Sequence, residues 1–375
     1  MTEITAAIEL LMPPRVEIGL GSLTKLPEWV EARKVRRVLV VSGGYNAQRV
    51  SQLGLTGSVR LFGDVKPEPD IENLNQAVTV ADDFEPDCII GFGGGSAMDL
   101  AKLVAVLYRN SKSVRDIAGM ELAPRRRCVL VQVPTTAGTG SEAGIRALVT
   151  DPVTRSKLAV QSREMLADLV IIDATLTMTS PPHVSAATGV DAMAHCVEAY
   201  TSKRAHPVTD LYAREGIRLI GRYLPIVVRN GSDIRARAAL ALASFYGGIC
   251  LGPVNTTAGH AVAYPLGTRH HIAHGAANAL IFPHTLAFNF SAAKQRTEEV
   301  MMALGLDATG EEPIRAAAHA FCARLGIEMH LSALNIPRDD LPIMAGEAAG
   351  IRRLLDHNPR DIGRDEILNI YERAY

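Results

Sequence analysis

Residues 88–102 read CIIGFGGGSAMDLAK, and this stretch decides the fold of the first half of the chain. The apolar residues 88–91 predict a strand that is buried on both faces, as in parallel sheets. Three consecutive glycines, Gly93 to Gly95, predict a tight turn, and a helix follows. Glycines let a backbone approach an anion closely, and the first amides of the next helix can bind that anion. The stretch therefore indicates a candidate phosphate-binding turn.

The residues of this turn leave two interpretations open. In one, the turn binds a phosphate. In the other, it is a plain tight strand-to-helix turn. Separately, Ser96 is a candidate cap of the helix, with Asp99 three residues later completing a capping-box-like pair. The turn is not the G-x-G-x-x-G fingerprint, and no acid stands about twenty residues further on, where the standard Rossmann pattern places one.

Working outward, apolar and β-branched runs predict further strands in the first half, over 38–41, 58–62, 129–133 and 169–172. Helical patterns over 47–53 and 71–83 separate them, and residues 143–150 and 156–160 read as a hairpin. Strands that alternate with helices predict a parallel, doubly wound α/β layer.

The strand at 129–133 runs into PTTAGTGSE (134–142). Four hydroxyl side chains and two glycines follow the strand in this loop. Such a loop can donate several hydrogen bonds to phosphate or amide groups, or it can satisfy only its own polar groups.

The second half of the chain has a different pattern. From about residue 182 the sequence shows long stretches with a period of 3.6 and almost no β-branched alternation. Helices are predicted over 184–201, 207–230, 233–250, 255–264, 276–291, 295–304, 311–325, 338–351 and 364–374. We therefore place a domain boundary near residue 178 and predict a helix-on-helix second domain.

Composition restricts the class of protein. The chain has 375 residues, enough for two domains, with 47% hydrophobic and 21% charged residues. A formal net charge of −1 gives no sign of a nucleic-acid or membrane partner. No run of 18 or more apolar residues predicts a transmembrane span, and the N-terminus is not a secretory signal. Five widely spaced cysteines predict buried free thiols in a reducing compartment.

Asp191 and His195 stand four residues apart in the helical stretch ATGVDAMAHCVEAY (187–200). Residues at i and i+4 share a helix face, so a carboxylate oxygen and an imidazole nitrogen can point at one place. The later tract GHAVAYPLGTRHHIAHG (259–275) can add two more imidazoles, a set that suits Fe(II) or Zn(II). A capped or surface pair, and a histidine-rich tract without partners, are the plainer interpretations.

Four motifs in order resemble the iron-containing, or group III, alcohol dehydrogenases. They are GGGSAMDLAK (93–102), PTTAGTGSE (134–142), ATGVDAMAHCVEAY (187–200), and GHAVAYPLG with HIAHGAANAL (259–280). The resemblance runs from about residue 10 to the end of the chain. It implies a Rossmann-like dinucleotide-binding α/β domain over 1–178 and an all-helical metal and substrate domain over 179–375, the fold shared with dehydroquinate synthase. It also implies a divalent metal in the cleft between these domains.

The resemblance assigns candidate site residues one by one. The metal ligands fall on Asp191, His195, His260 and His274, for Fe2+ or, in some relatives, Zn2+. The cofactor is NAD(P), and its candidate binding residues are Gly94, Gly95, Ser96 and Asp99 at the pyrophosphate, Thr135, Thr136 and Thr139 near the phosphates and nicotinamide, and Lys157 near the ribose.

Two departures from the family pattern leave details open. Tyr264 stands where many relatives have a histidine with a role in proton transfer, and a phenol with a pKa near about 10 is a poorer shuttle. His270 or His271 is then the candidate relay, so Tyr264, His270 and His271 are the candidate catalytic residues. In addition, Gly43 stands where NAD-preferring relatives often have an acid, which leaves NADP open. Arg49 nearby is either favourable to a phosphate or a solvated helix residue.

We therefore expect a cytoplasmic, metal-dependent NAD(P)-linked alcohol dehydrogenase or aldehyde reductase. It would transfer hydride between nicotinamide and an alcohol, aldehyde or keto acid, most simply as a homodimer. The alternative is a maleylacetate reductase-like or hydroxyacid–oxoacid transhydrogenase-like enzyme that acts on a carboxylated substrate. Dehydroquinate synthase-like and glycerol dehydrogenase-like chemistry, or a non-enzymatic nucleotide sensor, fit the motifs less well. The substrate itself does not follow from the sequence.

Overall fold

The computed structural model of the protein describes residues 4–154 and 156–375. It divides into two compact units, one of Leu10–Thr179 and one of Ser180–Tyr375 together with the N-terminal segment that ends at Glu9. His206 Nε2 lies 3.1 Å from the carbonyl oxygen of Ala6, which ties this segment to the helical unit. We describe the two units separately.

A parallel sheet forms the centre of the unit Leu10–Thr179. Its order is β1 (Val16–Ile18), β9 (Leu169–Ile172), β6 (Val129–Pro134), β4 (Cys88–Gly93), β2 (Arg37–Val41) and β3 (Ser58–Phe62). Every neighbouring pair in this order is parallel. The predicted parallel α/β layer is therefore confirmed.

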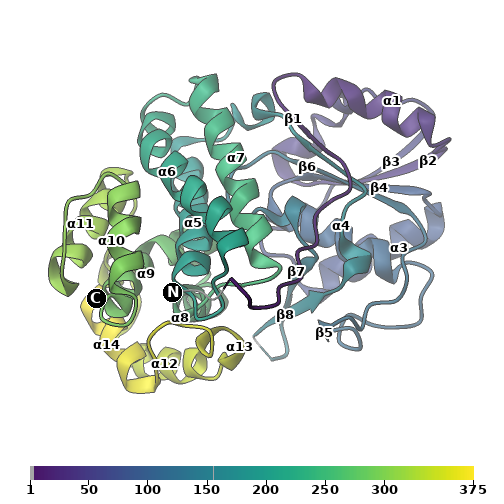
Figure 1. Ribbon diagram of the computed structural model, residues 1–375. Coiled ribbons are helices and arrows are strands. Elements are labelled where there is room, and N and C mark those ends of the chain that lie inside the picture. Colours follow the sequence, from purple (N-terminus) through teal and green to yellow (C-terminus); the bar gives the residue numbers. More distant parts are fainter. Residues whose placement is uncertain (1–3, 155) are drawn as a thin grey trace. The chain divides into compact units, whose positions relative to one another are not determined.

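Helices cover both faces of this sheet because its strands are apolar on both sides. Val38 and Val40 face the same core as Trp29 of α1 (Lys25–Ala32). On the opposite face, Gln132 of β6 donates from Nε2 to the carbonyl of Met98 in α4 (Gly95–Leu107) at 3.1 Å. Helix α3 (Ile71–Phe84) lies beside α4, on the side of the sheet away from α1 (Figure 1). The layer is thus doubly wound, as predicted.

The strand order reverses between β2 and β4. The chain passes outward from β2 to the edge strand β3 and then returns to the other side of β2 as β4. The carboxyl ends of β2 and β4 are Val41 and Gly93, and the glycines at 43–44 and 93–95 follow them. Open α/β sheets bind ligands at such a point, outside the carboxyl ends of the strands.

A second, smaller sheet has the order β5 (Gly119–Met120), β8 (Ser156–Gln161) and β7 (Arg146–Asp151). Strands β7 and β8 pair antiparallel, which confirms the predicted hairpin. The sequence analysis missed β1, α1 and β5, and it predicted one helix where α2 (Gly44–Ala47) and a 3-10 turn (Val50–Leu53) lie. Strands of two or three residues carry too few side chains to show a period of two.

The second unit is built of helices, as predicted. They are α5 (Pro182–Thr201), α6 (Pro207–Arg229), α7 (Ile234–Leu251), α8 (Ala258–His270), α9 (His274–Asn289), α10 (Lys294–Ala303), α11 (Glu311–Arg324), α12 (Leu341–Ala349), α13 (Arg352–Leu355) and α14 (Arg364–Ala374). Helices α5, α6 and α7 lie side by side (Figure 1).

Helix α5 is buried along most of its length. Glycines let its neighbours approach closely: a Cβ added to Gly189 would lie 2.4 Å from Leu224 Cδ1, and one added to Gly216 would lie 2.5 Å from Cys196 Sγ. Helix α7 is the one described helix that is long and apolar enough to cross a membrane by length and composition, and 67% of it is buried inside the protein. A core helix of a helical domain has these properties.

Helix α8 differs from its predicted extent. The expected helix ended at residue 264, before Pro265, because proline lacks an N–H and disfavours a helix interior. In the structure α8 continues through Pro265 to His270. Leu266 is buried in a core that Ile281 of α9 and Met344 of α12 share, so tertiary packing holds the extra turn. The five cysteines are buried and free, as predicted.

Candidate active site

Three buried side chains meet where α5 and α8 pack together. Asp191 and His195 lie one turn apart on α5, and His260 lies in the first turn of α8. One potential ligand atom of each lies within 4.8 Å of the others. His260 Nε2 is 3.5 Å from Asp191 Oδ1, and His195 Nε2 is 3.9 Å from the same oxygen. The spacing of four on one helix thus produces a common focus at this carboxylate.

His274 reaches the same carboxylate from the start of α9. Its Nε2 lies 3.5 Å from Asp191 Oδ1, and its ring centroid is 5.4 Å from that of His260. The rings of His195 and His260 stack at 4.7 Å. The side chain of His274 is 29% exposed, whereas those of the other three residues are 5% exposed or less. The cluster is therefore most open to solvent at His274.

The charges of this cluster depend on one another. Burial alone would raise the pKa of Asp191, but His195, His274 and His260 together hold it well below its usual range. Burial alone would lower the pKa of His260, whereas Glu198 and Asp191 raise it to about 10. With no cation present, a proton on His260 therefore balances part of the buried negative charge.

The donor atoms fit a divalent cation. Within the part of the chain that the structure describes, the buried His260 Nε2 has no hydrogen-bond partner, although it is directed at the carboxylate of Asp191. A buried nitrogen in this state usually has a ligand. One carboxylate and three imidazoles form a set that Fe2+ and Zn2+ accept, and a cation there would replace the proton on His260.

Glu198 fixes the orientation of His260, and sequence analysis missed it. His260 Nδ1 lies 2.6 Å from Glu198 Oε1, and the backbone N–H of Thr257 donates to Oε2 at 2.5 Å. A carboxylate that accepts from Nδ1 leaves Nε2 free of hydrogen for a metal. A Cβ at Gly259 would lie 2.6 Å from Glu198 Oε1, so the glycine gives this carboxylate its room. The signal was present, since Glu198 follows His195 by three residues on the same face of α5.

Asn278 is a second buried polar residue that sequence analysis missed. It lies on α9, one turn after His274, and its Nδ2 donates to Asp191 Oδ1 at 2.6 Å. The same atom lies 3.2 Å from His274 Nε2. Asn278 therefore holds the Asp191 carboxylate in place from α9.

The structure places the three candidate catalytic residues apart. Tyr264 lies beside the cluster, with its ring centroid 6.0 Å from that of His274. His270 Nε2 lies 3.2 Å from Asp340 Oδ2, and His271 is an exposed residue at the end of α8 with a φ of 56°. Among the described residues, no contact links His270 or His271 to Asp191 or its ligand partners. Of the three candidate catalytic residues, Tyr264 is therefore the one that the structure places beside the cluster.

The glycine turn after β4 leaves no space for side chains. Gly94 is the N-cap of α4, and among the described residues no side chain caps this helix. A Cβ at Gly95 would lie 2.5 Å from Thr139 Cγ2, and one at Gly94 would lie 3.1 Å from Thr136 Oγ1. The turn and the threonine loop therefore pack directly on each other. The prediction that Ser96 caps the helix is wrong. Ser96 is the second residue of α4, and its Oγ accepts from the N–H of Glu68 at 3.2 Å.

Asp99, which the resemblance places at the pyrophosphate, is hydrogen-bonded within the protein. Its Oδ1 accepts from Ser141 Oγ at 2.5 Å and its Oδ2 accepts from the N–H of Leu148 at 2.9 Å. Buried Lys102 donates to the carbonyls of Ser141 and Arg146 at 2.5 and 2.8 Å. Asp99 therefore fastens the threonine loop to α4.

The other predicted cofactor residues lie around the same turn. Thr139 Oγ1 accepts from the N–H of Ser141 at 3.3 Å, and Thr136 is half-buried. The buried Thr135 Oγ1 has no partner among residues 4–154 and 156–375. Lys157 lies on β8, where it donates to Glu68 Oε2 at 2.8 Å and Thr150 Oγ1 at 2.9 Å. Lys157 therefore joins β8 to the segment after β3.

The loop after β2 is also tightly packed. A Cβ at Gly43 would lie 2.4 Å from the carbonyl oxygen of Val65, so no acidic side chain fits there without a shift of the backbone. Arg49 donates to Thr179 Oγ1 at 3.1 Å and its guanidinium lies 5.3 Å from the ring of Tyr45. Arg49 is thus half-buried in the turn that follows α2, with partners in the same unit.

Comparisons with known proteins agree over the whole chain. A family model for iron-containing alcohol dehydrogenase matches residues 13–174, and one for the C-terminal part of the Fe-containing alcohol dehydrogenase family matches residues 185–375. The chain is 36% identical to long-chain-alcohol dehydrogenase 1 of Geobacillus thermodenitrificans over 382 residues, which is 98% of this chain and 96% of that protein.

Solved structures share the fold. The structure is similar to that of a 1,3-propanediol oxidoreductase, with a TM-score of 0.92 and 30% identity over 99% of this chain and 100% of the other. It is also similar to sulfoacetaldehyde reductase from Bifidobacterium kashiwanohense in complex with NAD+, with a TM-score of 0.88 and 26% identity over 98% and 99% of the two chains.

Proposed function

The chain belongs to the iron-containing alcohol dehydrogenase family and is an oxidoreductase that acts on CH–OH groups, and we propose that it works as a metal-dependent, NAD(P)-linked alcohol dehydrogenase and aldehyde reductase. One observation supports this most. The side chains of His195, His260 and His274 converge on one carboxylate oxygen of the buried Asp191. We propose that these four residues hold Fe2+, with Zn2+ as the alternative metal.

A divalent cation at this point supplies Lewis-acid chemistry, which eases removal of an alcohol proton in oxidation and polarises a carbonyl in reduction. Asp191 contributes the negative charge that partly offsets the cation. Glu198 keeps the Nδ1 proton of His260 in place, so that Nε2 stays available. The partly exposed His274 marks the side from which a substrate oxygen approaches.

Tyr264 is our candidate for orienting that oxygen. It is 8% exposed, lies beside His274, and its phenol can donate one hydrogen bond and accept others. A phenol near a substrate oxygen holds its orientation without needing to ionise at neutral pH. Tyr264 is also the feature that keeps the hydroxyacid–oxoacid transhydrogenase-like alternative open, because that branch resembles this chain at the same position.

For the cofactor we propose NAD(P) at the turn after β4. Support comes from the reversal of strand order at β2 and β4, from the uncapped start of α4, and from the NAD+ complex of a structural relative. Gly94, Gly95, Thr135 and Thr136 line this turn or the loop beside it. Since Gly43 leaves no negative charge after β2, we propose that both NAD and NADP are accepted.

The relatives indicate the substrate class. They are named for long-chain alcohols, 1,3-propanediol and sulfoacetaldehyde, and we propose a small-molecule alcohol or aldehyde. We further propose that the protein is cytoplasmic, which the five buried free thiols support because such thiols are typical of a reducing compartment. For its assembly we propose a homodimer, the commonest form of soluble oligomers.

A spectrophotometric screen tests the proposal. Purified protein loaded with Fe2+ or Zn2+ is mixed with NAD or NADP and a panel of alcohols, and in reverse with NADH or NADPH and aldehydes or keto acids. We expect a change in nicotinamide absorbance with alcohols and aldehydes that a chelator abolishes. Turnover that needs no metal and occurs only with keto acids would favour the maleylacetate reductase-like alternative.

A further inference from the structure

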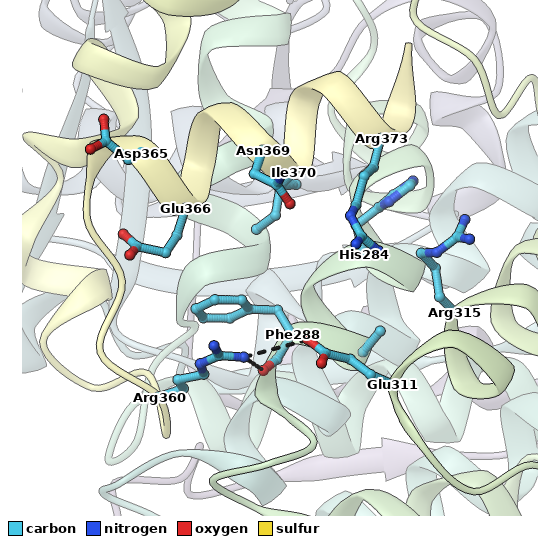
Figure 2. A pocket seen from close by; sticks show the side chains of 11 residues that line it. His284, Phe288, Glu311, Arg315, Arg360, Asp365, Glu366, Asn369, Ile370 and Arg373 are labelled. Atoms are coloured by element: carbon cyan, nitrogen blue, oxygen red, sulfur yellow. Dashed lines mark hydrogen bonds and ion pairs between the residues drawn. The ribbon is translucent and has the colours of Figure 1, made fainter.

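A separate pocket lies within the helical unit, among α9, α11, α14 and the segment before α14. Its volume is about 290 Å3. Its lining includes none of the four candidate metal ligands. Arg373, His284 and Arg315 gather at one end, and Asp365 and Glu366 lie at the other (Figure 2). The two ends therefore present opposite charges.

His284 is a buried polar residue with unmet hydrogen-bonding capacity. It is 3% exposed and stands on α9, and among the described residues neither of its ring nitrogens has a hydrogen-bond partner. Burial, together with Arg315, His319 and Arg373, lowers the pKa of His284 to about 4, so the ring is neutral at pH 7. A neutral imidazole has one donor and one acceptor nitrogen, and an unpaired buried polar group is costly.

Two arginines provide further donors beside this ring. Arg315 bonds to Glu312 through Nε and Nη2, at 3.1 and 2.6 Å, and Arg373 bonds to the other oxygen of Glu312 through Nη1. Each guanidinium has five N–H donors, so donors remain on both. Two guanidinium groups share the carboxylate of Glu312, and Glu311, which also lines the pocket, pairs with Arg360 at 3.4 Å, so this end keeps a net positive charge. The planar fork of arginine matches the oxygens of a phosphate group.

At the acidic end of the pocket, Glu366 and Arg360 have partners within the protein, whereas the Asp365 side chain is 92% exposed. Glu366 accepts from the N–H of Gly363 at 2.9 Å, and Arg360 donates to the carbonyl of Phe288 at 2.9 Å while its guanidinium stacks over that ring at 4.1 Å (Figure 2). Along α14, residues 366 and 373 are separated by about 10 Å at the helical rise. An anion at the basic end is therefore far from Glu366.

We propose that Arg315, Arg373 and His284 form a binding site for a phosphate group, either free or as a small phosphomonoester. Because the second pKa of such a phosphate is about 6, two ionisation states are present near neutral pH. Both carry ionised oxygens, and the more protonated state also carries a hydroxyl. The ionised oxygens accept from the guanidinium groups, and the hydroxyl donates to the ring nitrogen of His284 that carries no hydrogen. Sulfate has no proton to donate at this pH, so the site discriminates between the two anions.

The test measures binding of inorganic phosphate to the full chain by calorimetry at pH 6.5. Saturating cofactor is present, so that phosphate at the glycine turn does not contribute. We expect one phosphate per chain with a Kd tighter than about 1 mM, and weaker binding of sulfate. Glycerol phosphate serves as the second probe: tighter binding than inorganic phosphate identifies a phosphomonoester as the ligand, and weaker binding identifies the free ion. Both results support the site.

Variants assign the binding to this pocket. Arg315→Met and Arg373→Met, both at partly exposed positions, should each weaken phosphate binding by about tenfold or more. The matched control is Arg352→Met, which removes an exposed arginine paired with Asp356 outside the pocket and should change nothing. His284→Leu should weaken binding similarly, and His284→Gln, which keeps a donor and an acceptor, should retain most of it.

Three results would overturn the proposal. They are no phosphate binding to the wild-type chain, unchanged binding in the Arg315→Met/Arg373→Met double variant, and sulfate binding as tight as phosphate binding. If His284→Leu fails to fold, the two arginine variants decide the matter alone, because their side chains are 29% and 48% exposed and their loss leaves the core intact.

Discussion

The cluster around Asp191 and the glycine turn before α4 are built on opposite principles. In the cluster, charged side chains converge, and each depends on its partners for its protonation state. In the turn, side chains are absent, and the space is so tight that a Cβ at Gly95 would collide with Thr139. A site made of side chains needs neighbours that orient them, whereas a site made of backbone needs neighbours that leave room. Substitutions should therefore damage the two sites in different and separable ways.

The largest expected effect is loss of charge at the centre of the cluster. Asp191→Asn keeps the shape of the side chain but removes the only carboxylate that the four candidate ligands contribute. We expect turnover to fall by about a thousandfold or more, since several kcal/mol of transition-state stabilisation depend on the cation. Cofactor binding should remain within about twofold of wild type. The matched control is Asp361→Asn, an exposed aspartate whose loss should leave steady-state kinetics unchanged.

The reverse separation is expected at the turn. Gly95→Ala adds a Cβ that would lie 2.5 Å from Thr139 Cγ2, so the loop must move, at a cost of about 1–3 kcal/mol. We expect cofactor affinity, measured by fluorescence titration with NADH, to fall by about a hundredfold while bound metal stays unchanged. Adding Thr139→Ala should recover part of the loss, because it removes the two nearest atoms. A loss of metal in Gly95→Ala would show that the two sites are not separable.

Glu198 separates orientation of a ligand from ligation itself. Among the described residues, its side chain hydrogen-bonds to His260 and to none of the other three candidate ligands. Glu198→Gln removes the charge but keeps a hydrogen-bond acceptor for His260 Nδ1, and Glu198→Ala removes both. Residues that orient a metal ligand typically change metal affinity by about 10–100-fold. Competition with a chelator should place Glu198→Ala at the upper end of this range and Glu198→Gln at the lower end. Equal affinities for both variants and wild type would rule out an orienting role.

The smallest expected effect concerns the loop beside the turn. Burial raises the pKa of Glu142 to about 7 from an ordinary value of 4.5, against the favourable effects of its backbone contact and Lys102. An acid whose pKa is raised on folding contributes stability below pH 4.5 and loses it as the pH rises through 7. Glu142→Gln should therefore match wild type at pH 4.5 and exceed it at pH 8. We expect a gain of about 1 kcal/mol in urea unfolding, less than the shift alone implies, because the amide no longer pairs with Lys102. A variant less stable than wild type at pH 8 would contradict this.

Sequence patterns predicted what depends on local spacing. The strands around the glycine turn follow from continuous apolar runs, and the convergence of Asp191 with His195 follows from i, i+4 geometry. The hairpin of β7 and β8 was likewise predicted from two neighbouring short stretches. The partners of Asp99 did not follow, because Ser141 lies 42 residues away and only the fold brings them together. For the same reason α8 runs through Pro265, since burial of Leu266 in a shared core outweighs the local cost.

The position of Asn278 shows the limit of motif reading. It stands within a quoted motif, HIAHGAANAL, yet its residue type gives no sign that it donates to Asp191 at 2.6 Å. Amides occur in many helices, and spacing of four from His274 has meaning only once the partner helix is placed. The residues that orient the candidate ligands can therefore be identified only from a structure, whereas the charged ligands themselves can be predicted from the sequence.

The central claim is that the Asp191 cluster is a metal centre, and metal analysis tests it most directly. Wild-type protein and His260→Ala are purified without oxygen, bound metals are measured, and NADH and NADPH are titrated in the same preparations. The account predicts about one Fe or Zn per chain in wild type, and loss of that metal in His260→Ala with cofactor binding retained. Full turnover in a wild-type preparation without metal, or unchanged metal content in the variant, would contradict it.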